Sequence, residues 1–115
     1  MSIGNDIPTV DVAAARARLE SGAVMVDVRE PEEWHAGHAA AAVWIPMGEI
    51  EARHTELSAD VPIVVMCRSG NRSGVVTQAL VQAGYDASNI AGGMHAWADA
   101  GFDVVTDSGS PGSVA

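Results

Sequence analysis

The sequence has very little of three things: cysteine, lysine and aromatic residues. Cys67 is the single cysteine, so an internal disulfide is excluded and nothing indicates an oxidising compartment. All six basic residues are arginines, and fifteen acidic residues bring the net charge to −9. Such a chain repels nucleic acids and anionic membranes, so we expect neither as a partner. An anionic substrate would need a local cationic pocket.

Long apolar segments are also missing. No run approaches the ~18 apolar residues that a membrane span needs, and the start "MSIGNDIPTV" lacks the features of a signal peptide. We therefore expect a cytoplasmic protein. The hydrophobic fraction of 48% in 115 residues suits one domain with an aliphatic core. We expect this domain to cover residues 1–105, and the small, polar residues 106–115 to form a flexible C-terminal tail.

Apolar runs alternate with helical patterns along the chain. Strands are predicted at residues 23–28, 41–46, 62–67 and, weakly, 87–91. Helices are predicted at residues 11–22, 30–38, 48–57, 72–83 and 93–101, and the last is followed by "FDVV". Asp11 is the expected N-cap of the first helix, and Pro31 lies in the first turn of the second. This alternation predicts an α/β fold, a mainly parallel sheet of about five strands with helices on both faces.

The stretch "PIVVMCRSGNRSGVV" carries the candidate chemistry. Cys67 ends the strongest predicted strand, at the carboxyl edge where open α/β sheets bind ligands. The N–H groups of residues 68–73 should point inward and form an anion nest at a helix N-terminus. Such surroundings lower a thiol pKa from its usual value of about 8.5. We expect a reactive thiolate rather than an inert, buried cysteine.

The residue types of this loop fit a tight anion-binding turn better than packing. Gly70 lets the backbone close tightly, and Asn71 tolerates unusual backbone angles. Arg68 and Arg72 add positive charge on either side of the cysteine. In the helix that follows, Val75, Val76, Ala79, Leu80 and Ala83 are expected on one apolar side.

The loop "CRSGNRSG" resembles the active-site loop of single-domain rhodanese sulfurtransferases. The segment "VDVREPEEWHAGHAAAAVWIP" is similar to the N-terminal signature of that family, and "AGGMHAWADAGFDVV" is similar to its C-terminal signature. The resemblance runs from about residue 10 to 105. Ala39 replaces the usual isoleucine and Ala41 the usual glycine, and both substitutions bear on local packing more than on chemistry.

The resemblance implies a thiosulfate sulfurtransferase in which Cys67 is the nucleophile that becomes a persulfide. The donor is a small sulfur anion such as thiosulfate, held by Arg68 and Arg72. The acceptor comes from outside, as cyanide, a small thiol or a protein thiol, because the chain has no second cysteine. No cofactor is implied. The sulfur would be cradled by the active-site loop, which consists of Arg68, Ser69, Gly70, Asn71, Arg72 and Ser73.

Two charged residues near the end of the 23–28 strand are candidate supports for the loop. Asp27 could brace it by pairing with Arg72, although a helix cap or a surface acid fits equally well. Arg29 is expected to make a structural ion pair with Glu32 or Glu33, and His38 a structural hydrogen bond.

The remaining histidines and the tryptophans suggest no further chemistry. Trp34, Trp44 and Trp97 are expected in the core or at its rim. The other histidines lack metal-ligand spacing with the cysteine, so we expect no metal site. These histidines are His35, His54 and His95.

Three other readings of the loop remain. Phosphatases and arsenate reductases of related fold also use a thiolate and an arginine, but with a C-x5-R loop. Cys67 to Arg72 is C-x4-R, a narrower cradle that suits one sulfur atom better than a tetrahedral oxyanion. A carrier that passes persulfide sulfur between proteins would use the same chemistry at Cys67. The intact cysteine argues against an inactive, regulatory copy of the fold.

Overall fold

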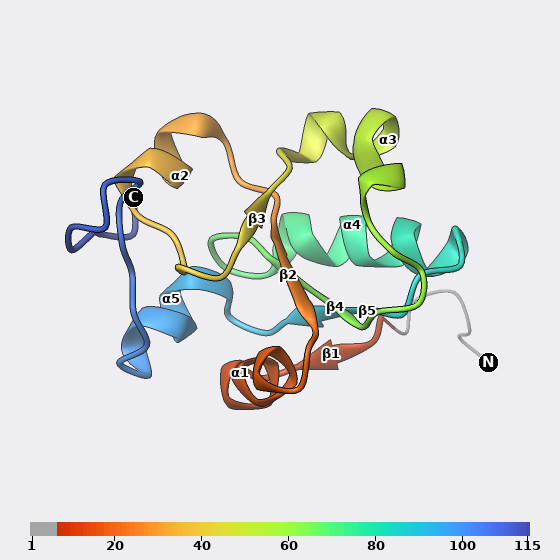
Figure 1. The fold of residues 1–115 in the computed structure, drawn as a ribbon, viewed down its shortest axis with the longest axis horizontal. Helices are drawn as coiled ribbons and strands as arrows, with labels where there is room; N and C mark the ends of the chain where they lie inside the picture. The colour runs from red at the N-terminus through yellow and green to blue at the C-terminus, as the bar shows by residue number, and fades with distance from the viewer. Residues whose placement is uncertain (1–6) are drawn as a thin grey trace.

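The computed structural model describes residues 7–115, and its centre is one sheet of five parallel strands. The strands lie in the order β1-β5-β4-β2-β3 (Figure 1). This confirms the predicted α/β fold with its parallel sheet. The strand bounds are Thr9–Val10 for β1, Val24–Asp27 for β2, Val43–Trp44 for β3, Ile63–Met66 for β4 and Ala87–Ile90 for β5.

Strand β1 was not predicted, because two residues are too short to show a periodic pattern. It pairs with the edge of β5 through the register Thr9 to Asn89. The "FDVV" segment is not a strand of this sheet. Its last residue, Val105, makes isolated antiparallel bridges with His38 and Pro111.

The helices alternate with the strands as expected. Their bounds are Val12–Glu20 for α1, Pro31–Ala36 for α2, Ile50–Arg53 for α3, Asn71–Gln82 for α4 and Gly93–Asp99 for α5. The single helix expected at residues 48–57 is instead α3 between two 3₁₀ turns, η1 (Met47–Glu49) and η2 (His54–Glu56). None of these three pieces has a side-chain cap, which is consistent with their shortness.

Two helix starts follow the predicted chemistry. The Asp11 carboxylate accepts the N–H of Ala14 at 2.8 Å and caps α1. Helix α2 begins with Pro31, and Glu30 and Glu33 close a capping box around its first turn. The sequence therefore fixes where both helices begin.

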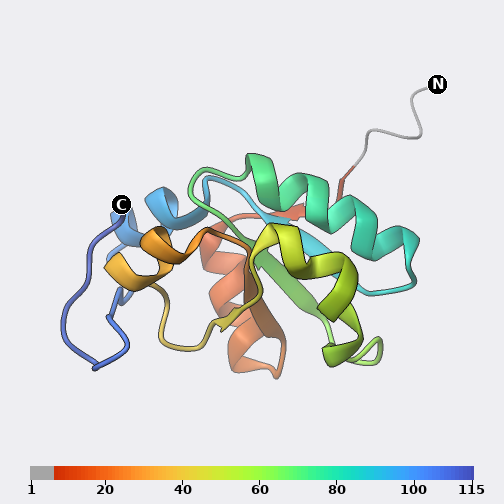
Figure 2. The ribbon, with the colours of Figure 1, turned by 90° about the horizontal axis from the view of Figure 1, so that it is seen from above.

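The strand residues alternate between two apolar clusters, one on each face of the sheet. Helices α3 and α4 cover one face, where Ile50, Val76 and Leu80 pack on strand residues such as Val26 and Val65. Figures 1 and 2 show α1 and α5 on the opposite face. The second cluster combines strand residues with residues of α1 and α5, namely Met25, Val64, Met66, Ile90, Ala15, Met94 and Trp97. The prediction of helices on both faces is confirmed.

The five residues expected on one apolar side of α4 do lie on one side, where all of them line a groove, but they are not equally buried. Val76 and Leu80 are buried, but Val75 is 58% exposed, and Ala79 and Ala83 also face solvent. The buried face instead includes the small polar residues Ser73 and Thr77. Thr77 is accommodated there because its hydroxyl donates to the Ser73 carbonyl at 2.7 Å.

The segment expected to be a flexible tail lies beside α2. Ser113 N–H donates to the Ala36 carbonyl at 2.9 Å, and Gly112 N–H donates to the Val104 carbonyl at 2.9 Å. Its flexibility stays a prediction. Across residues 7–115, no helix has the length and apolar character needed to cross a membrane.

Candidate active site

The candidate site lies at the edge of the sheet where three neighbouring strands end. Because β2, β4 and β5 are parallel, their carboxyl ends meet at this edge. β2 ends at Asp27, opposite Met66 at the end of β4, and Cys67 follows directly. Cys67 is 1% exposed. The expected position of the cysteine at a strand end is confirmed.

The Cys67 sulfur is surrounded by hydrogen-bond donors. Sγ accepts the Gly70 N–H at 3.1 Å and the Ser73 hydroxyl at 3.2 Å. Burial raises the pKa of the Cys67 thiol. The hydrogen bonds from the Ser73 hydroxyl and from the N–H groups of Ser73, Gly70 and Ser69 together lower it by more than burial raises it. The net pKa lies below its ordinary value, so the cradle favours the thiolate.

The loop closes through a glycine in the left-handed region. Gly70 has φ = +104° and precedes the first residue of α4. A Cβ at this position would lie 3.4 Å from the Gly92 nitrogen, so a side chain here would be disfavoured mainly by the positive φ. Asn71 does not use its tolerance of unusual backbone angles: it begins α4, and every non-glycine residue of the described chain has a negative φ.

Asn89, in the middle of β5, supports the loop from outside it. Its Nδ2 donates to the Gly70 carbonyl at 3.0 Å, and its Oδ1 accepts the Ser73 hydroxyl at 2.6 Å. The single Ser73 hydroxyl proton therefore has two acceptors, Asn89 Oδ1 and Cys67 Sγ. Sequence reasoning missed this residue. A polar side chain inside a weak buried strand was the available signal.

The start of α5 fixes the main chain of the cysteine. The N–H groups of Met94 and His95 donate to the carbonyls of Cys67 and Arg68, at 2.8 Å and 3.1 Å. Gly93 lies in the left-handed region with φ = +54°, and any Cβ there would collide with the Cys67 carbonyl. Gly93 of "AGGMHAW" thus lets α5 approach the loop closely.

Asp27 and Arg29 form a fully buried ion pair with each other. Arg29 Nη2 lies 2.8 Å from Asp27 Oδ2, both side chains are 0% exposed, and Arg29 Nε donates to the same carboxylate. Arg29 also donates to the carbonyls of Glu33 and Gly37. The expected pairing of Asp27 with Arg72, and its reading as a cap or surface acid, were wrong. Arg29 does form a structural ion pair, but its expected partners Glu32 and Glu33 were wrong, because the carboxylate is that of Asp27.

Arg72 is bound to Glu33 of α2. The two guanidinium nitrogens lie 2.7 Å and 2.8 Å from the two carboxylate oxygens, a bidentate pair. The hydrogen bond from Arg72 lowers the Glu33 pKa from 4.5 to about 2, against the opposing effect of burial. This pair fastens the first turn of α4 to α2.

Arg68 follows the cysteine but turns away toward the C-terminal segment. It is exposed, and its Nε donates to the main-chain oxygen of Ala115 at 2.8 Å. The structure therefore brings Cys67, Ser69, Gly70 and Ser73 together around the sulfur and gives both arginines protein partners. That Arg68 and Arg72 hold a donor stays a prediction.

Comparison with known proteins identifies the fold. The rhodanese-like domain family matches residues 11–100. The chain belongs to this family. A rhodanese-related protein from Thermoplasma volcanium is 29% identical, with a TM-score of 0.82 over 87% of this chain and 99% of that one.

Two further solved structures share the rhodanese-like fold. A thiosulfate sulfurtransferase from Pseudomonas aeruginosa is 24% identical, with a TM-score of 0.79 over 95% of this chain and 22% of that one. A Rhodopseudomonas palustris protein of unknown function, called a possible tyrosine phosphatase, is 28% identical, with a TM-score of 0.73 over 85% and 84%. The likeness to the first shows the fold alone.

His38 of this rhodanese-like domain has structural partners. His38 stacks on Trp34 at 3.6 Å, its Nδ1 lies 3.0 Å from the Ala39 carbonyl, and its Nε2 lies 3.0 Å from Asp107. Its expected structural hydrogen bond is confirmed. Trp34 and Trp97 are buried, and Trp44 is partly buried. Within residues 7–115, no three histidine, cysteine or acidic side chains lie close enough to hold a metal ion.

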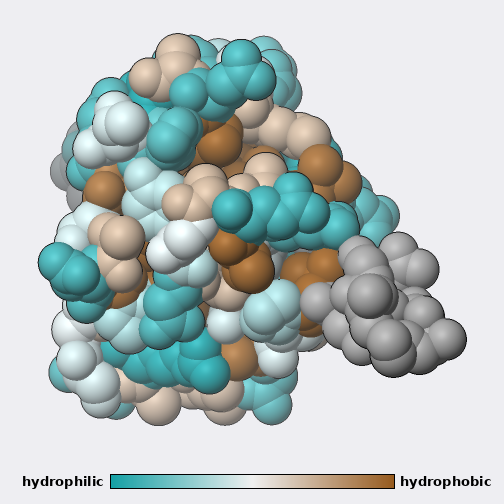
Figure 3. Space-filling view, turned by 90° about the vertical axis from the view of Figure 1, so that its right-hand side faces the viewer, coloured by the Kyte–Doolittle hydropathy of each residue, from teal (hydrophilic) through white to brown (hydrophobic). Residues whose placement is uncertain are grey.

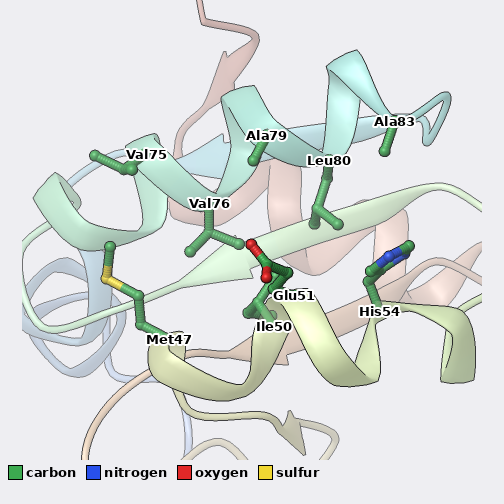
Figure 4. A pocket seen from close by; sticks show the side chains of 9 residues that line it. All are labelled: Met47, Ile50, Glu51, His54, Val75, Val76, Ala79, Leu80 and Ala83. Atoms are coloured by element: carbon green, nitrogen blue, oxygen red, sulfur yellow. The ribbon is translucent and has the colours of Figure 1, made fainter.

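An apolar groove of about 320 Å³ runs between α3 and α4 of the domain, and Cys67 does not line it. Figure 4 shows Met47 and Val75 at one end, and His54 and Ala83 at the other. The end of the molecule in Figure 3 also carries apolar residues set among hydrophilic ones. The groove is lined partly by α4, the helix that begins at the loop, but it is separate from the sulfur cradle.

Proposed function

We propose that the protein is a sulfurtransferase that carries sulfane sulfur as a persulfide on Cys67. The observation that carries this proposal is the ring of donors around Sγ, from Gly70, Ser73 and their neighbours. Family membership supports it, because rhodanese-like domains include sulfurtransferases. The donor would be thiosulfate or a similar anion, and the acceptor cyanide, a small thiol or a protein thiol.

The first half-reaction is a nucleophilic displacement at sulfur. The Cys67 thiolate attacks the outer sulfur of the donor, and a new S–S bond forms. The bond between that sulfur and the rest of the donor breaks, and its electron pair leaves with sulfite when the donor is thiosulfate. The negative charge now rests on the outer sulfur of the persulfide, within reach of the loop N–H groups that stabilised the thiolate.

The second half-reaction restores the thiolate. A nucleophilic acceptor attacks the outer sulfur, and the S–S bond to Cys67 breaks with its electron pair on Sγ. The donors from Gly70 and Ser73 again stabilise the leaving thiolate. Since Cys67 is the only cysteine of the chain, the acceptor must be a second molecule. Ping-pong kinetics follow from this order of events.

A phosphatase is the less favoured reading of the same loop. The Rhodopseudomonas palustris protein carries such a description, and a phosphatase would also use a thiolate with an arginine. In this chain Arg72 is engaged by Glu33, and the C-x4-R loop directs its N–H groups at a single sulfur atom. These features support sulfur transfer. A carrier role, in which both donor and acceptor are proteins, would use the same persulfide.

Mass spectrometry of the intact protein tests the proposal. After incubation with thiosulfate, the protein should gain the mass of one sulfur atom, and cyanide should remove it. Cys67→Ser should gain nothing, because a hydroxyl does not ionise near neutral pH, and it should remain folded by circular dichroism. A wild-type protein that gains no sulfur, or a Cys67→Ser protein that gains it equally, would exclude this function.

A further inference from the structure

The surroundings of Arg72 determine what charge a donor can bring to the site. This inference rests on the proposed sulfurtransferase function. The loop contains two arginines. The Nε of Arg68 donates to the main-chain oxygen of Ala115, which leaves Arg72 as the arginine to consider. Whether Arg72 is free to bind a second anion therefore decides how much negative charge a donor can carry.

Arg72 is already surrounded by negative groups. Glu33 occupies both of its outer nitrogens at 2.7 Å and 2.8 Å. The pKa of Arg72 is raised first by the hydrogen bond to Glu33, and then by the charges of Glu33, Cys67 and Glu30. The Cys67 thiolate and the Glu30 carboxylate therefore also interact with the Arg72 guanidinium. The Arg72 guanidinium thus already interacts with three negative groups before a donor arrives.

The Glu33 carboxylate is held firmly in this position. Its side chain is 15% exposed, and its Oε1 also accepts the Glu30 N–H at 3.0 Å in the capping box. A donor that takes Arg72 from Glu33 would have to leave a half-buried carboxylate without its cation, beside the incoming anion. A second negative charge on the donor therefore adds repulsion and finds the Arg72 guanidinium already occupied by Glu33.

We propose that Glu33 is a specificity-determining residue, which by holding the Arg72 guanidinium selects sulfur donors of low negative charge over dianions such as thiosulfate. Sulfane sulfur carried on a monoanion would meet the N–H groups of the cradle with less repulsion from Glu33 and Glu30. The overall charge of −9 acts in the same direction at longer range.

Two donors isolate the effect of charge. Thiosulfate is a dianion, and methanethiosulfonate is a monoanion in which a methyl group replaces one sulfonate oxygen. Each gives its outer sulfur to the Cys67 thiolate, and the S–S bond breaks with its electron pair on sulfite or on methanesulfinate. Both reactions leave the same persulfide, so the ratio of their kcat/KM values reports donor recognition.

Three variants of α2 complete the experiment. Glu33→Gln removes the charge and keeps an oxygen for the capping box and for Arg72. Glu33→Asp keeps the charge on a shorter side chain. Glu32→Gln removes one charge from the exposed face of the same helix and is the matched control. Rates of Cys67 persulfide formation are measured with both donors.

We expect Glu33→Gln to raise the thiosulfate to methanethiosulfonate ratio of kcat/KM by about tenfold, mainly through the KM for thiosulfate, since the variant removes a unit charge that repels a dianion more than a monoanion. Glu33→Asp should stay near the wild-type ratio, and Glu32→Gln should change it about twofold at most because its charge is screened by solvent. Wild-type protein should favour methanethiosulfonate, relative to the rates of both donors with free cysteine.

The outcomes separate the two proposals. A Glu33→Gln ratio equal to that of Glu32→Gln overturns the role of Glu33 and leaves sulfur transfer intact. The role of Glu33 is also overturned, without any variant, if the thiosulfate to methanethiosulfonate ratio is higher for wild-type protein than for free cysteine. If neither donor forms a persulfide on wild-type Cys67, the sulfurtransferase function itself is wrong, and the inference fails with it.

Discussion

The ends of β2 and β4 lie side by side, but their charged and polar groups are arranged in opposite ways. At the end of β2, Asp27 and Arg29 neutralise each other and are completely buried. At the end of β4, the Cys67 sulfur accepts hydrogen bonds from the Gly70 N–H and the Ser73 hydroxyl. A strand end whose charges are satisfied internally can only support the fold, whereas one with donors in excess can hold an added anion.

The difference arises from the residues that follow each strand. After β2 the chain returns Arg29 directly onto Asp27, and Trp44 donates to the Arg29 carbonyl at 2.9 Å. After β4 the chain turns through Gly70 into the N-terminus of α4, where free N–H groups gather. Glu33 and Arg72 join the two regions, and this pair is only partly buried.

The largest expected effect concerns stability at the β2 end. Arg29→Ala leaves the Asp27 carboxylate buried without a cation and removes donors from two carbonyls. We expect a loss of about 3–5 kcal/mol in the free energy of unfolding, measured by urea denaturation. Arg53→Ala, which breaks exposed pairs with Glu49 and Glu56, is the control and should barely move the midpoint. If both variants lost the same free energy of unfolding, the buried Asp27–Arg29 pair would contribute no more than an exposed ion pair.

The next effect concerns reactivity at the β4 end. Ser73→Ala removes the hydroxyl that donates to Sγ at 3.2 Å, so the pKa of Cys67 should rise. We expect alkylation of Cys67 by iodoacetamide at neutral pH to slow about tenfold, the effect of one hydrogen bond to a charged group. The measurement is the alkylation rate as a function of pH. Thr77→Val, one turn further along α4, removes a buried hydroxyl without touching the sulfur and should keep the wild-type profile.

The same variant changes how stability depends on pH. The folded-state pKa of Cys67 lies below its ordinary value, so the thiolate stabilises the folded state above the unfolded pKa. That contribution is lost as the pH falls through the folded-state pKa. It should shrink in Ser73→Ala. An unchanged difference in unfolding free energy between pH 6 and pH 10 would show that the hydroxyl does not act on the thiolate.

A smaller effect is expected from Asn89→Ala. This change removes the donor that holds the Gly70 carbonyl, so the Gly70 N–H should be less well aimed at Sγ. It also frees the Ser73 hydroxyl to donate to Sγ alone, which offsets part of the loss. We expect alkylation of Cys67 to slow about threefold. Ser88→Ala, the neighbouring residue whose hydroxyl contacts Arg18, is the control. An unchanged rate would mean that the loop backbone alone orders the cradle.

The sequence was enough to predict strands β2 to β5 and the position of Cys67, because apolar runs and turn residues act locally. It was not enough to predict the partners of the charged residues. Arg72 lies 39 positions from Glu33, and either Asp27 or Glu33 could have been its carboxylate until the strand register was known. Asn89 was missed for the same reason, since its two hydrogen bonds depend on how β5 sits beside the loop.

The smallest expected effect concerns the pair that joins the two regions. Glu33 has its pKa lowered from 4.5 to about 2, first by the hydrogen bond from Arg72. A folded-state pKa below the unfolded one means that the pair stabilises the fold above about pH 4.5 and that this contribution disappears as the pH falls toward 2. Because the Arg72 side chain is 34% exposed, we expect a contribution of only about 1 kcal/mol at pH 7.

Urea denaturation of wild-type protein and Glu33→Gln at pH 7, 5 and 3 measures this contribution. The two midpoints should differ at pH 7 and pH 5 and converge toward pH 3, where wild-type Glu33 begins to bind a proton. Glu32→Gln should differ little from wild type throughout, since its carboxylate is exposed. A Glu33→Gln difference that persists unchanged at pH 3 would mean that Glu33 supports the fold through packing or its capping box.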